Sequence, residues 1–515
     1  KMVVHYLLYE TSVSFQCAFI LSIIYSLIWL KNKLTANLPP GPWGIPGFGY
    51  LPFIREETHM AMYKLSQKFG DVFSITLGQR VFVVLSDPTV IREAFNQSAF
   101  SGRPMTPLYG MFNGFGVVNT RGKMWKDERR FLHQKLIKHG MKKFGSGREK
   151  MEAKIHTEVH DLLISIQREE GRPLCPEKLL TALATNVITS FMTSTRFDAN
   201  DPIFLKHKEI NSEGFKLFAK LDMVNYIWAM KFLPSVKKDM RKLAANHSES
   251  MNFFRNVINE RRSTFKPNDD KDILDAYLQV EYEREDEIIN FDVQVAQVLC
   301  DLVSAGSESA KTTLSWVLLY LLHNQDVVQK MRDEIDEHVN KTRLPNMSDQ
   351  EKLVYCQATI NEVLRIANVT PIAPNHATEK SLTLRGYNIP KGSSVVALLY
   401  ACHMNPKYWD DPEDFRPERF INEEGRLSIQ KAFIPFGKGQ RNCLGDTLAQ
   451  TEIFLVITAL IQNFSLENPP NTPLPTKKGI LGATHAPVNF DICFKVRSDC
   501  FIFRHRKERL ATRTA

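Results

Sequence analysis

A short segment near the C-terminal end, residues 436–445 with the sequence FGKGQRNCLG, has the residue types of a metal-binding thiolate site. Gly437 and Gly439 permit a tight backbone turn, so that N–H groups can point at the sulfur of Cys443. A helix that begins just after Cys443 would turn its positive N-terminal end toward the same atom, and Arg441 adds a cation. Together these features favour the ionised thiolate, which is the form that binds metal ions.

The remaining cysteines offer this sulfur no partners for zinc. The chain has eight cysteines but no C-x-x-C pair and no cluster of cysteine and histidine; the other seven are Cys17, Cys175, Cys300, Cys356, Cys402, Cys493 and Cys500. Structural zinc takes four ligands, whereas haem iron needs a single axial ligand from the protein. We therefore expect Cys443 to ligate haem iron, and the other thiols to be reduced and mostly buried.

With the spacing F-x-x-G-x-R-x-C-x-G, the segment resembles the haem-binding loop of the cytochromes P450, a family of haem-thiolate monooxygenases. The resemblance implies a mainly α fold with small β-sheets, preceded by one N-terminal transmembrane helix. It also implies haem b with an axial thiolate, and places Phe436 and Gly437 in the haem site. Two alternatives are a single-pass membrane receptor or scaffold, which has no use for this motif, and a haem-thiolate isomerase.

Three further charged residues match the family in the expected order. Glu362 and Arg365 stand in an E-x-x-R motif, and Arg419 stands in the P-E-R-F motif at 417–420. On their own, Glu362 and Arg365 would be a surface pair worth a few tenths of a kcal/mol. The resemblance implies instead that all three form a buried network behind the haem, which serves structure and haem retention rather than catalysis.

A second set of residues matches the family's partners of the haem propionates. Trp125 and Arg129 fit the W-x-x-x-R helix, and His376 stands where relatives place another propionate partner, although Asn375 replaces a common proline. The resemblance implies that Arg129, His376 and Arg441 compensate the two propionate carboxylates. A surface histidine after a proline turn is the alternative for His376.

Residues 305–309, AGSES, resemble the family's oxygen-activation motif, A-G-x-D/E-T. A glycine inside a helix costs up to about 1 kcal/mol relative to alanine, so Gly306 indicates a functional or packing reason. The resemblance implies a catalytic pair, with Glu308 as acid and Ser309 as alcohol, that relays protons while the O–O bond breaks. Serine lacks the methyl that fixes the threonine rotamer, so we expect a less tightly ordered relay.

Helices predominate among the elements that would position these residues. Helical apolar spacing occurs at 149–168, 178–194, 245–264, 291–323 and 324–340. The segment 291–323 is long and apolar enough to predict a buried central helix. Residues 55–100 instead combine one helix with two strand-like runs, DVFSITLG and RVFVVLSD, which predict a small sheet near the N-terminus.

Residues 11–30 carry no charge and would span about 30 Å as a helix, which predicts one transmembrane segment. Lys31 and Lys33 follow it, so the positive-inside rule places the rest of the chain in the cytosol. We expect a membrane anchor at 1–33, a Pro/Gly-rich hinge at 34–52, a catalytic domain at 53–497 and a basic tail at 498–515. With the family resemblance, this predicts a single-pass protein of the endoplasmic reticulum membrane.

The composition is that of a globular protein, with 515 residues, 43% hydrophobic, 24% charged and a net charge of +9. The basic residues alternate with acidic ones and accompany no nucleic-acid motif, so we expect an anionic membrane or an acidic protein as partner. A basic cluster contains Arg129, Arg130, Lys135, Lys138, Lys142 and Lys143. The resemblance implies that this cluster meets NADPH–cytochrome P450 reductase, with cytochrome b5 as a further candidate partner and O2 as co-substrate.

Three segments outside the general motifs resemble the arthropod ecdysteroid 26-hydroxylase branch: RRFLHQKLIKHGM with the KFGSG that follows, SAGSESAKTTLSW, and GILGATHAPVNF. This resemblance implies hydroxylation at C26 of 20-hydroxyecdysone. An ecdysteroid 25-hydroxylase and an enzyme that oxidises juvenile hormone or fatty acids are the alternatives.

By motif position, the substrate pocket is predicted to contain Tyr109, Phe112, Phe115, Ser304, Ala305, Thr370, Ile372, Ala373, Thr484 and His485. Thr370, Thr484 and His485 could hydrogen-bond a polyhydroxylated steroid, or merely satisfy nearby backbone.

Overall fold

The computed structural model describes residues 37–112, 114–198, 201–284 and 290–498, together with residues 16, 19–24, 26, 27 and 31. The predicted membrane helix at 11–30 lies largely outside the described residues, as do residues 499–515 of the predicted tail. Within the described part of the chain, no helix is both long and apolar enough to cross a membrane.

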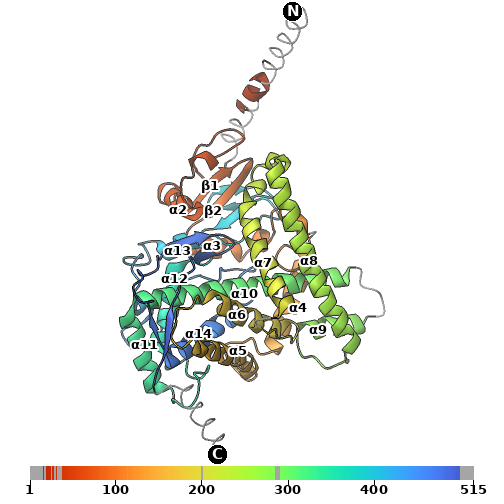
Figure 1. The fold of residues 1–515 in the computed structure, drawn as a ribbon. Coiled ribbons are helices and arrows are strands. Elements are labelled where there is room, and N and C mark those ends of the chain that lie inside the picture. Colours follow the sequence, from red (N-terminus) through yellow and green to blue (C-terminus); the bar gives the residue numbers. More distant parts are fainter. Residues whose placement is uncertain are drawn as a thin grey trace, which may run out of the picture.

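The fold is mainly helical with small sheets, as the sequence predicts, and the largest sheet lies at the N-terminal end of the molecule (Figure 1). The two predicted strands, β1 (Val72–Leu77) and β2 (Arg80–Leu85), pair antiparallel. A distant strand, β6 (Ser394–Ala397), then joins β2 in parallel, and β3 (His376–Ala377) joins β6 antiparallel. The parallel pairing therefore brings the region before the cysteine loop back to the N-terminal sheet.

The central helix α10 (Phe291–His323) has the predicted bounds and crosses the middle of the molecule (Figure 1). Its C-terminal half is buried, because Leu314, Trp316 and Leu318 are inaccessible in the largest hydrophobic cluster. That cluster fills the space between α10 and the helices α5 (Arg148–Arg168), α6 (Glu177–Met192), α12 (Val354–Ala367) and α14 (Asp446–Asn463). The core thus surrounds the helix that carries the predicted proton relay.

The remaining helices surround this core. They are α2 (Thr58–Phe69), α3 (Pro88–Phe95), α4 (Gly122–Lys138), α7 (Pro202–Lys220), α8 (Pro234–Thr264), α9 (Ile273–Tyr282), α11 (Gln325–His338) and α13 (Leu399–Met404). Short 3-10 turns are η1 (Leu51–Phe53), η2 (Ser98–Phe100), η3 (Tyr109–Phe112), η4 (Asp222–Asn225), η5 (Trp228–Phe232) and η6 (Pro417–Phe420). The other strands are β4 (Leu382–Leu384), β5 (Tyr387–Ile389), β7 (Phe464–Glu467), β8 (Gly479–Leu481), β9 (His485–Pro487) and β10 (Cys493–Val496).

Local sequence explains where α3 begins, but it did not predict where α8 begins. Asp87 caps α3, because its carboxylate accepts the backbone N–H of Thr89 at 2.8 Å and Pro88 occupies the first helical position. By contrast, α8 begins at Pro234, well before the predicted start at residue 245. Its first three turns are rich in lysine and arginine and contain few apolar residues, so their periodicity gave a weak signal.

Candidate active site

The cysteine loop at 436–445 folds as a tight turn that closes on itself. The backbone N–H of Cys443 donates to the carbonyl oxygen of Phe436 at 2.9 Å. Gly437 and Gly439 have φ angles of +69° and +85°, which only glycine adopts without strain. The N-terminus of α14 follows at Asp446, as the sequence predicts, and the Gly445 N–H hydrogen-bonds to the Cys443 thiol.

Cys443 combines surface access with a strongly desolvated sulfur. Its residue is classed as exposed, yet burial raises the pKa of its thiol to about 11. The hydrogen bond from Gly445 and the charge of Arg129 lower the pKa, whereas Asp446 raises it. A sulfur that faces an interior space enclosed by protein would be both accessible to a ligand and shielded from bulk water. The protein's own charges do not ionise this thiol at neutral pH, so a bound cation is needed to hold the thiolate.

Arg441 does not act on the thiolate as the sequence suggested. Its guanidinium lies 4.0 Å from the Trp125 ring centre, and its Nε and Nη1 donate to the carbonyls of Ser101 and Val118 at 2.7 and 3.3 Å. The cation that lowers the Cys443 pKa is Arg129, whose Nη2 donates to Asn442 O at 2.6 Å and to Asn442 Oδ1 at 2.8 Å. The expectation that Arg441 supports the thiolate is therefore wrong, because backbone carbonyls draw its side chain away.

The structure adds an arginine that the sequence analysis missed. Arg103 donates from Nε to the Val118 carbonyl at 3.0 Å and from Nη1 to the carbonyls of Pro374 and Asn375 at 3.0 and 2.8 Å. Burial lowers the pKa of Arg103 to about 10 and that of Arg441 to about 8, and Arg103 and Arg129 lower the Arg441 value further. One feature of the sequence could have identified Arg103 as a candidate site residue: it is the sole charged residue between positions 94 and 120.

His376 is buried beside these arginines and stacks on Phe95, with ring centres 3.8 Å apart and an interplanar angle of 7°. Its Nδ1 lies 2.8 Å from the Phe100 carbonyl, which can only accept, so Nδ1 carries the proton. Burial lowers the pKa of His376 to about 3, and Arg103 and Arg441 add to the effect. In this neutral form Nε2 carries no proton and can only accept a hydrogen bond. His376 would have to be protonated on Nε2 before it could donate to a carboxylate.

Glu362, Arg365 and Arg419 meet in one buried network. Arg365 donates two hydrogen bonds to the Glu362 carboxylate, at 2.7 and 2.8 Å, and both side chains are fully buried. Arg419 Nε donates to Glu362 Oε1 at 3.2 Å, and the backbone N–H of Arg416 donates to the same oxygen at 2.9 Å. Arg365 also reaches the carbonyls of His403 and Pro412. The surface-pair alternative does not apply to these residues.

One face of α10 is left uncovered in the middle of the molecule. Ala305 is exposed, and Leu302 and Ser309 are half-buried, at helical spacings of three and four residues. Gly306 lies on a different face, where an added Cβ would approach Ile188 of α6 to 3.0 Å. The structure therefore gives Gly306 a packing reason.

Glu308 and Ser309 are not hydrogen-bonded to each other. The Ser309 hydroxyl donates to the carbonyl of Ala305 at 2.8 Å, within the helix. Glu308 instead receives Lys311 Nζ on both carboxylate oxygens at 2.9 Å, and the hydroxyls of Thr312 and Thr484 on Oε1 at 3.4 Å. The predicted acid is thus held by a lysine and two threonines that the sequence analysis did not assign to it.

The predicted pocket residues differ in how their side chains are engaged. Ser304 donates to Asn211 Oδ1 of α7 at 2.9 Å, away from the uncovered face of α10. His485 Nδ1 bonds to the Ala367 carbonyl at 2.8 Å, and its ring contacts Trp316 and His59. Tyr109, Phe115, Thr370 and Ile372 are half-buried and Ala373 is buried, while the Phe112 side chain lies outside the described part of the structure. His485 therefore satisfies a backbone carbonyl, as in the alternative interpretation of this residue, and Ser304 is held by a side chain of α7.

The residues present fit haem. Cys443 offers one accessible sulfur, and α10 has an uncovered face on which a flat macrocycle can rest. Arg103, Arg129 and Arg441 form no ion pair with any carboxylate of the described residues, so their charges suit a ligand with two propionates. The donor set does not suit a metal held by protein alone, because the described residues contain no group of three or more potential ligands.

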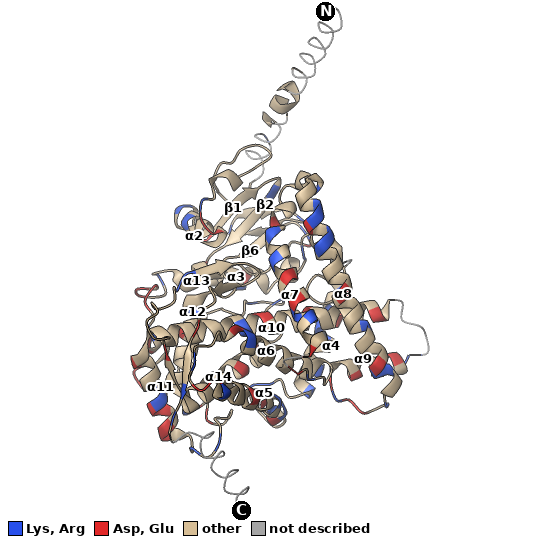
Figure 2. Ribbon diagram, in the orientation of Figure 1, with Lys and Arg blue, Asp and Glu red and all other residues tan. Residues whose placement is uncertain are grey.

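The basic cluster is partly neutralised within the protein. Arg129 turns inward to Asn442, and Arg130 pairs with Asp127 at 2.8 Å on the same helix. Lys135 and Lys138 both reach Asp270, Lys138 at 2.5 Å. In Figure 2, acidic residues lie beside basic ones along the ribbon around α4 and α9. Of the four lysines in the cluster, Lys142 and Lys143 form no salt bridge with a described acidic residue.

Two glycines of the cysteine loop provide a matched prediction. A Cβ at Gly439 would lie 2.2 Å from the Phe95 carbonyl oxygen, whereas a Cβ at Gly437 meets no atom within 4 Å. Gly439→Ala is therefore expected to displace the loop and to lower haem content several-fold. Gly437→Ala carries only the cost of a positive φ, about 1 kcal/mol. The haem content of each variant is measured as haem absorbance per mole of purified protein. Equal haem content in the two variants would contradict the prediction that a Cβ at Gly439 displaces the loop.

Comparison with known proteins places this geometry in a family. The family model described as "Cytochrome P450" matches residues 39–494. The chain is 39% identical over 488 residues to "Cytochrome P450 18a1" of Drosophila melanogaster, covering 93% of this chain and 91% of the relative. It is 32% identical to "Cytochrome P450 2U1" of Rattus norvegicus, over 93% and 94% of the two chains. It is also 32% identical to "Cytochrome P450 2L1" of Panulirus argus, over 88% and 93%.

Proposed function

Because the chain belongs to the cytochrome P450 family and is a haem-thiolate monooxygenase, we propose that it hydroxylates an ecdysteroid at the terminal side-chain carbon, C26 of 20-hydroxyecdysone. The observation that carries this proposal is the 39% identity to "Cytochrome P450 18a1", against 32% to the rat and lobster relatives. The three segments that resemble the ecdysteroid 26-hydroxylase branch point the same way. The reaction would inactivate the hormone.

When bound, haem supplies the oxygen chemistry that places one oxygen atom into a C–H bond. We assign Cys443 as the axial ligand, with Phe436 and Gly437 shaping its loop. Trp125, Arg129, His376 and Arg441, together with Arg103, are assigned to the propionates; Glu362, Arg365 and Arg419 are assigned to haem retention. This assignment rests on the three guanidinium groups that form no ion pair with a described carboxylate, and on the buried network.

Glu308 and Ser309 are proposed to move protons in the reaction. Ser309 is half-buried on the uncovered face of α10, so its hydroxyl can turn from the Ala305 carbonyl toward a neighbouring oxygen. Glu308 lies on the adjacent face of the helix, so a bridging water is needed to pass a proton between the two side chains. This arrangement supports a monooxygenase more than an isomerase, which does not require proton delivery.

For the substrate, Thr370 and Thr484 are the proposed hydrogen-bonding partners of steroid hydroxyls. Both side chains are half-buried, and the apolar residues Ile372 and Ala373 follow shortly after Thr370 in the chain. A pocket of this kind suits a steroid skeleton whose hydroxyls need partners, because an unpaired buried hydroxyl costs a few kcal/mol. His485 takes a smaller part in the proposal, because its Nδ1 proton is already donated to the Ala367 carbonyl.

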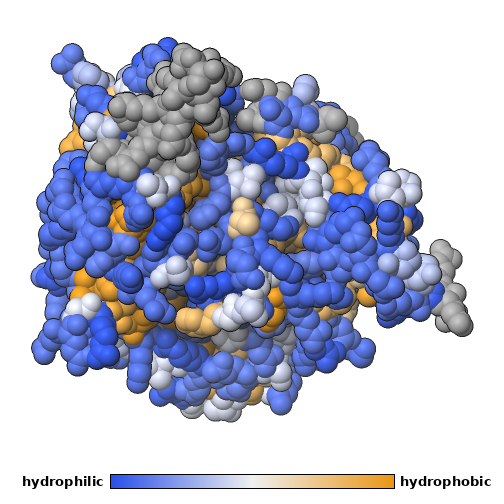
Figure 3. Space-filling view, turned by 90° about the horizontal axis from the view of Figure 1, so that it is seen from below, coloured by the Kyte–Doolittle hydropathy of each residue, from blue (hydrophilic) through white to orange (hydrophobic). Residues whose placement is uncertain are grey.

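We further propose a single-pass anchor in the endoplasmic reticulum membrane, with the catalytic domain in the cytosol. Exposed apolar side chains gather in two segments at the N-terminal end: Trp43, Ile45, Phe48 and Phe53, and Trp228, Phe232 and Leu233. Lysine and arginine colour the adjacent upper end of α8 in Figure 2, where they can meet anionic lipid headgroups. The opposite face is mostly hydrophilic (Figure 3), so the N-terminal end is the side that suits a membrane.

The proposed electron donor is NADPH–cytochrome P450 reductase, with cytochrome b5 as a further partner. Lys142 and Lys143, just after α4, are the lysines of the cluster with no salt bridge to a described acid, and Phe144 beside them is exposed. A basic patch with an adjacent aromatic side chain suits an acidic protein surface.

Reconstitution with reductase and NADPH tests the substrate. We expect 20-hydroxyecdysone to gain one oxygen, which fragmentation mass spectrometry should locate at C26, with further oxidation to the carboxylic acid. Ecdysteroid oxidation at C25 would favour the 25-hydroxylase alternative. Turnover of juvenile hormone or a fatty acid, without turnover of ecdysteroids, would overturn the substrate while leaving the monooxygenase chemistry in place.

A further inference from the structure

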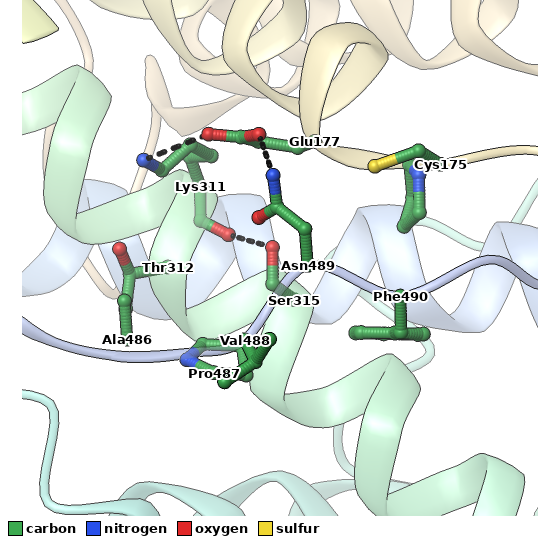
Figure 4. Close-up of a pocket in the computed structure, with 11 residues that line it drawn as sticks. Cys175, Glu177, Lys311, Thr312, Ser315, Ala486, Pro487, Val488, Asn489 and Phe490 are labelled. Carbon is green, nitrogen blue, oxygen red and sulfur yellow. Dashed lines mark hydrogen bonds and ion pairs between the residues drawn. The ribbon is translucent and has the colours of Figure 1, made fainter. Parts of the chain in front are cut away.

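Two small cavities share two lining residues, Lys311 and Glu177. Each has a volume of about 40 Å³, which is room for two or three water molecules. The outer cavity lies where the start of α6 meets the segment 486–490 (Figure 4). The inner cavity lies between α6, α7 and α10 and is lined by Glu308. Lys311 therefore borders both spaces.

The inner cavity is lined mainly by polar side chains. They are Glu177, Thr181, Thr185, His207, Lys208, Asn211, Ser212, Ser307, Glu308 and Lys311, with Phe204 and Val303 as the apolar exceptions. His207 is buried, and its Nε2 has no hydrogen-bond partner among the described residues. A buried polar atom without a protein partner is usually satisfied by water. Both the lining and this nitrogen indicate a hydrated chamber.

Ion pairs connect the chamber to the surface. Lys311 Nζ lies 2.9 Å from both oxygens of Glu308 and 3.9 Å from Glu177 Oε1. The Lys311 side chain is only 13% exposed, whereas that of Glu177 is 43% exposed. Figure 4 shows Glu177 between Lys311 and Asn489, whose Nδ2 donates to Glu177 Oε2 at 2.7 Å. A line of charged groups thus runs from solvent at Glu177 to the buried side of α10 at Glu308.

We propose that the inner cavity holds water that carries protons from the surface at Glu177 to Glu308, and that Lys311 is the positioning residue that holds the Glu308 carboxylate at the inner end of this chamber. The step is a proton transfer alone. A Glu308 oxygen takes a proton from a chamber water and passes one toward the Ser309 side of α10, so the carboxylate is restored and no oxidant or reductant is consumed. The proposal does not depend on which substrate the enzyme oxidises.

Hydration of the chamber can be measured without turnover. Hydroxyl radicals generated by a short X-ray pulse label side chains that lie next to bound water, and mass spectrometry locates the label. We expect His207 to be labelled in the haem-loaded protein despite its burial. His403 is the control, because it is also a buried histidine but has both ring nitrogens hydrogen-bonded, to Asn368 and to the Ile434 N–H. Labelling of His207 no stronger than that of His403 would mean a dry cavity and would overturn the proposal.

The role of Lys311 is tested by the peroxide released per NADPH consumed. Lys311→Met is expected to raise this ratio several-fold and to change its solvent isotope effect, with substrate affinity unchanged, whereas Lys311→Arg should restore the wild-type ratio. Lys495→Met removes a lysine of another Lys–Glu pair, with Glu467 at 2.5 Å, and should change nothing. If Lys311→Met releases no more peroxide than Lys495→Met, or Lys311→Arg fails to rescue, Lys311 does not position Glu308. Failure of ecdysteroid turnover with normal coupling on another substrate would leave this inference standing.

Discussion

Cys443→Ala is expected to abolish the red-shifted thiolate band of the carbon monoxide complex of the reduced protein. Among the cysteines that the structure describes, Cys443 alone is exposed. It also alone sits in a glycine turn with the Gly445 N–H on its sulfur and with Arg129 near it. No neighbouring side chain can replace this ligand, so we expect complete loss of the band rather than a shift. The measurement is the difference spectrum of the reduced protein with carbon monoxide minus the reduced protein without it.

Cys175→Ala is the matched control for this variant. Cys175 is the described cysteine with the next greatest access, and burial raises the pKa of its thiol. It lies at the outer cavity beside Glu177, in a segment that does not belong to the cysteine loop. The Cys175→Ala protein should keep the thiolate band at full intensity. A Cys443→Ala protein that retained the band would show that another thiol binds the iron.

Glu362→Gln is expected to destabilise the protein by about 3–5 kcal/mol, because it leaves Arg365 and Arg419 buried without their shared carboxylate. Glutamine keeps the shape of the side chain but lacks the charge. The two buried guanidinium groups then retain only carbonyl acceptors, such as those of His403 and Pro412 around Arg365. We expect a lower denaturant midpoint and a smaller fraction of purified protein that holds haem.

Glu169→Gln is the control with the same sequence spacing. Glu169 pairs with Arg172 at 3.4 Å, also three residues apart, but both side chains are largely exposed. Exposed pairs contribute between 0 and about 1 kcal/mol, so this change should leave the denaturant midpoint nearly unchanged. Equal effects of the two substitutions would show that burial does not set the strength of the Glu362 network.

The sequence predicted well those features that depend only on residues close together in the chain. The bounds of α10 follow from a continuous apolar period, and strands β1 and β2 follow from β-branched runs between Gly and Asp-Pro signals. The positive φ angles of Gly437 and Gly439 likewise follow from the turn that the loop requires. Family resemblance, rather than a local pattern, led us to assign the distant residues Trp125, Arg129 and His376 to the haem site.

The features that were missed depend on contacts between distant segments. Arg103 becomes part of the site only because the segments at 118 and 374–375 turn their carbonyls toward it. Arg441 was assigned to the thiolate from its closeness in sequence, but the carbonyls of Ser101 and Val118 take its side chain. The Thr484 contact to Glu308 also joins two segments that no periodicity connects. Such pairings depend on the tertiary fold and have no local signature.

The parallel pairing of β2 with β6 has a consequence for the order in which the chain can fold. Strand β2 can pair with β1 early during synthesis, but Phe82–Leu85 gain their second neighbouring strand only when Ser394–Ala397 have left the ribosome. Until then the β1–β2 hairpin carries an open hydrogen-bonding edge, which is prone to pair with other chains. The cysteine loop is made later still. Haem capture therefore comes at the end of a long interval in which that edge has to be kept from pairing with other chains.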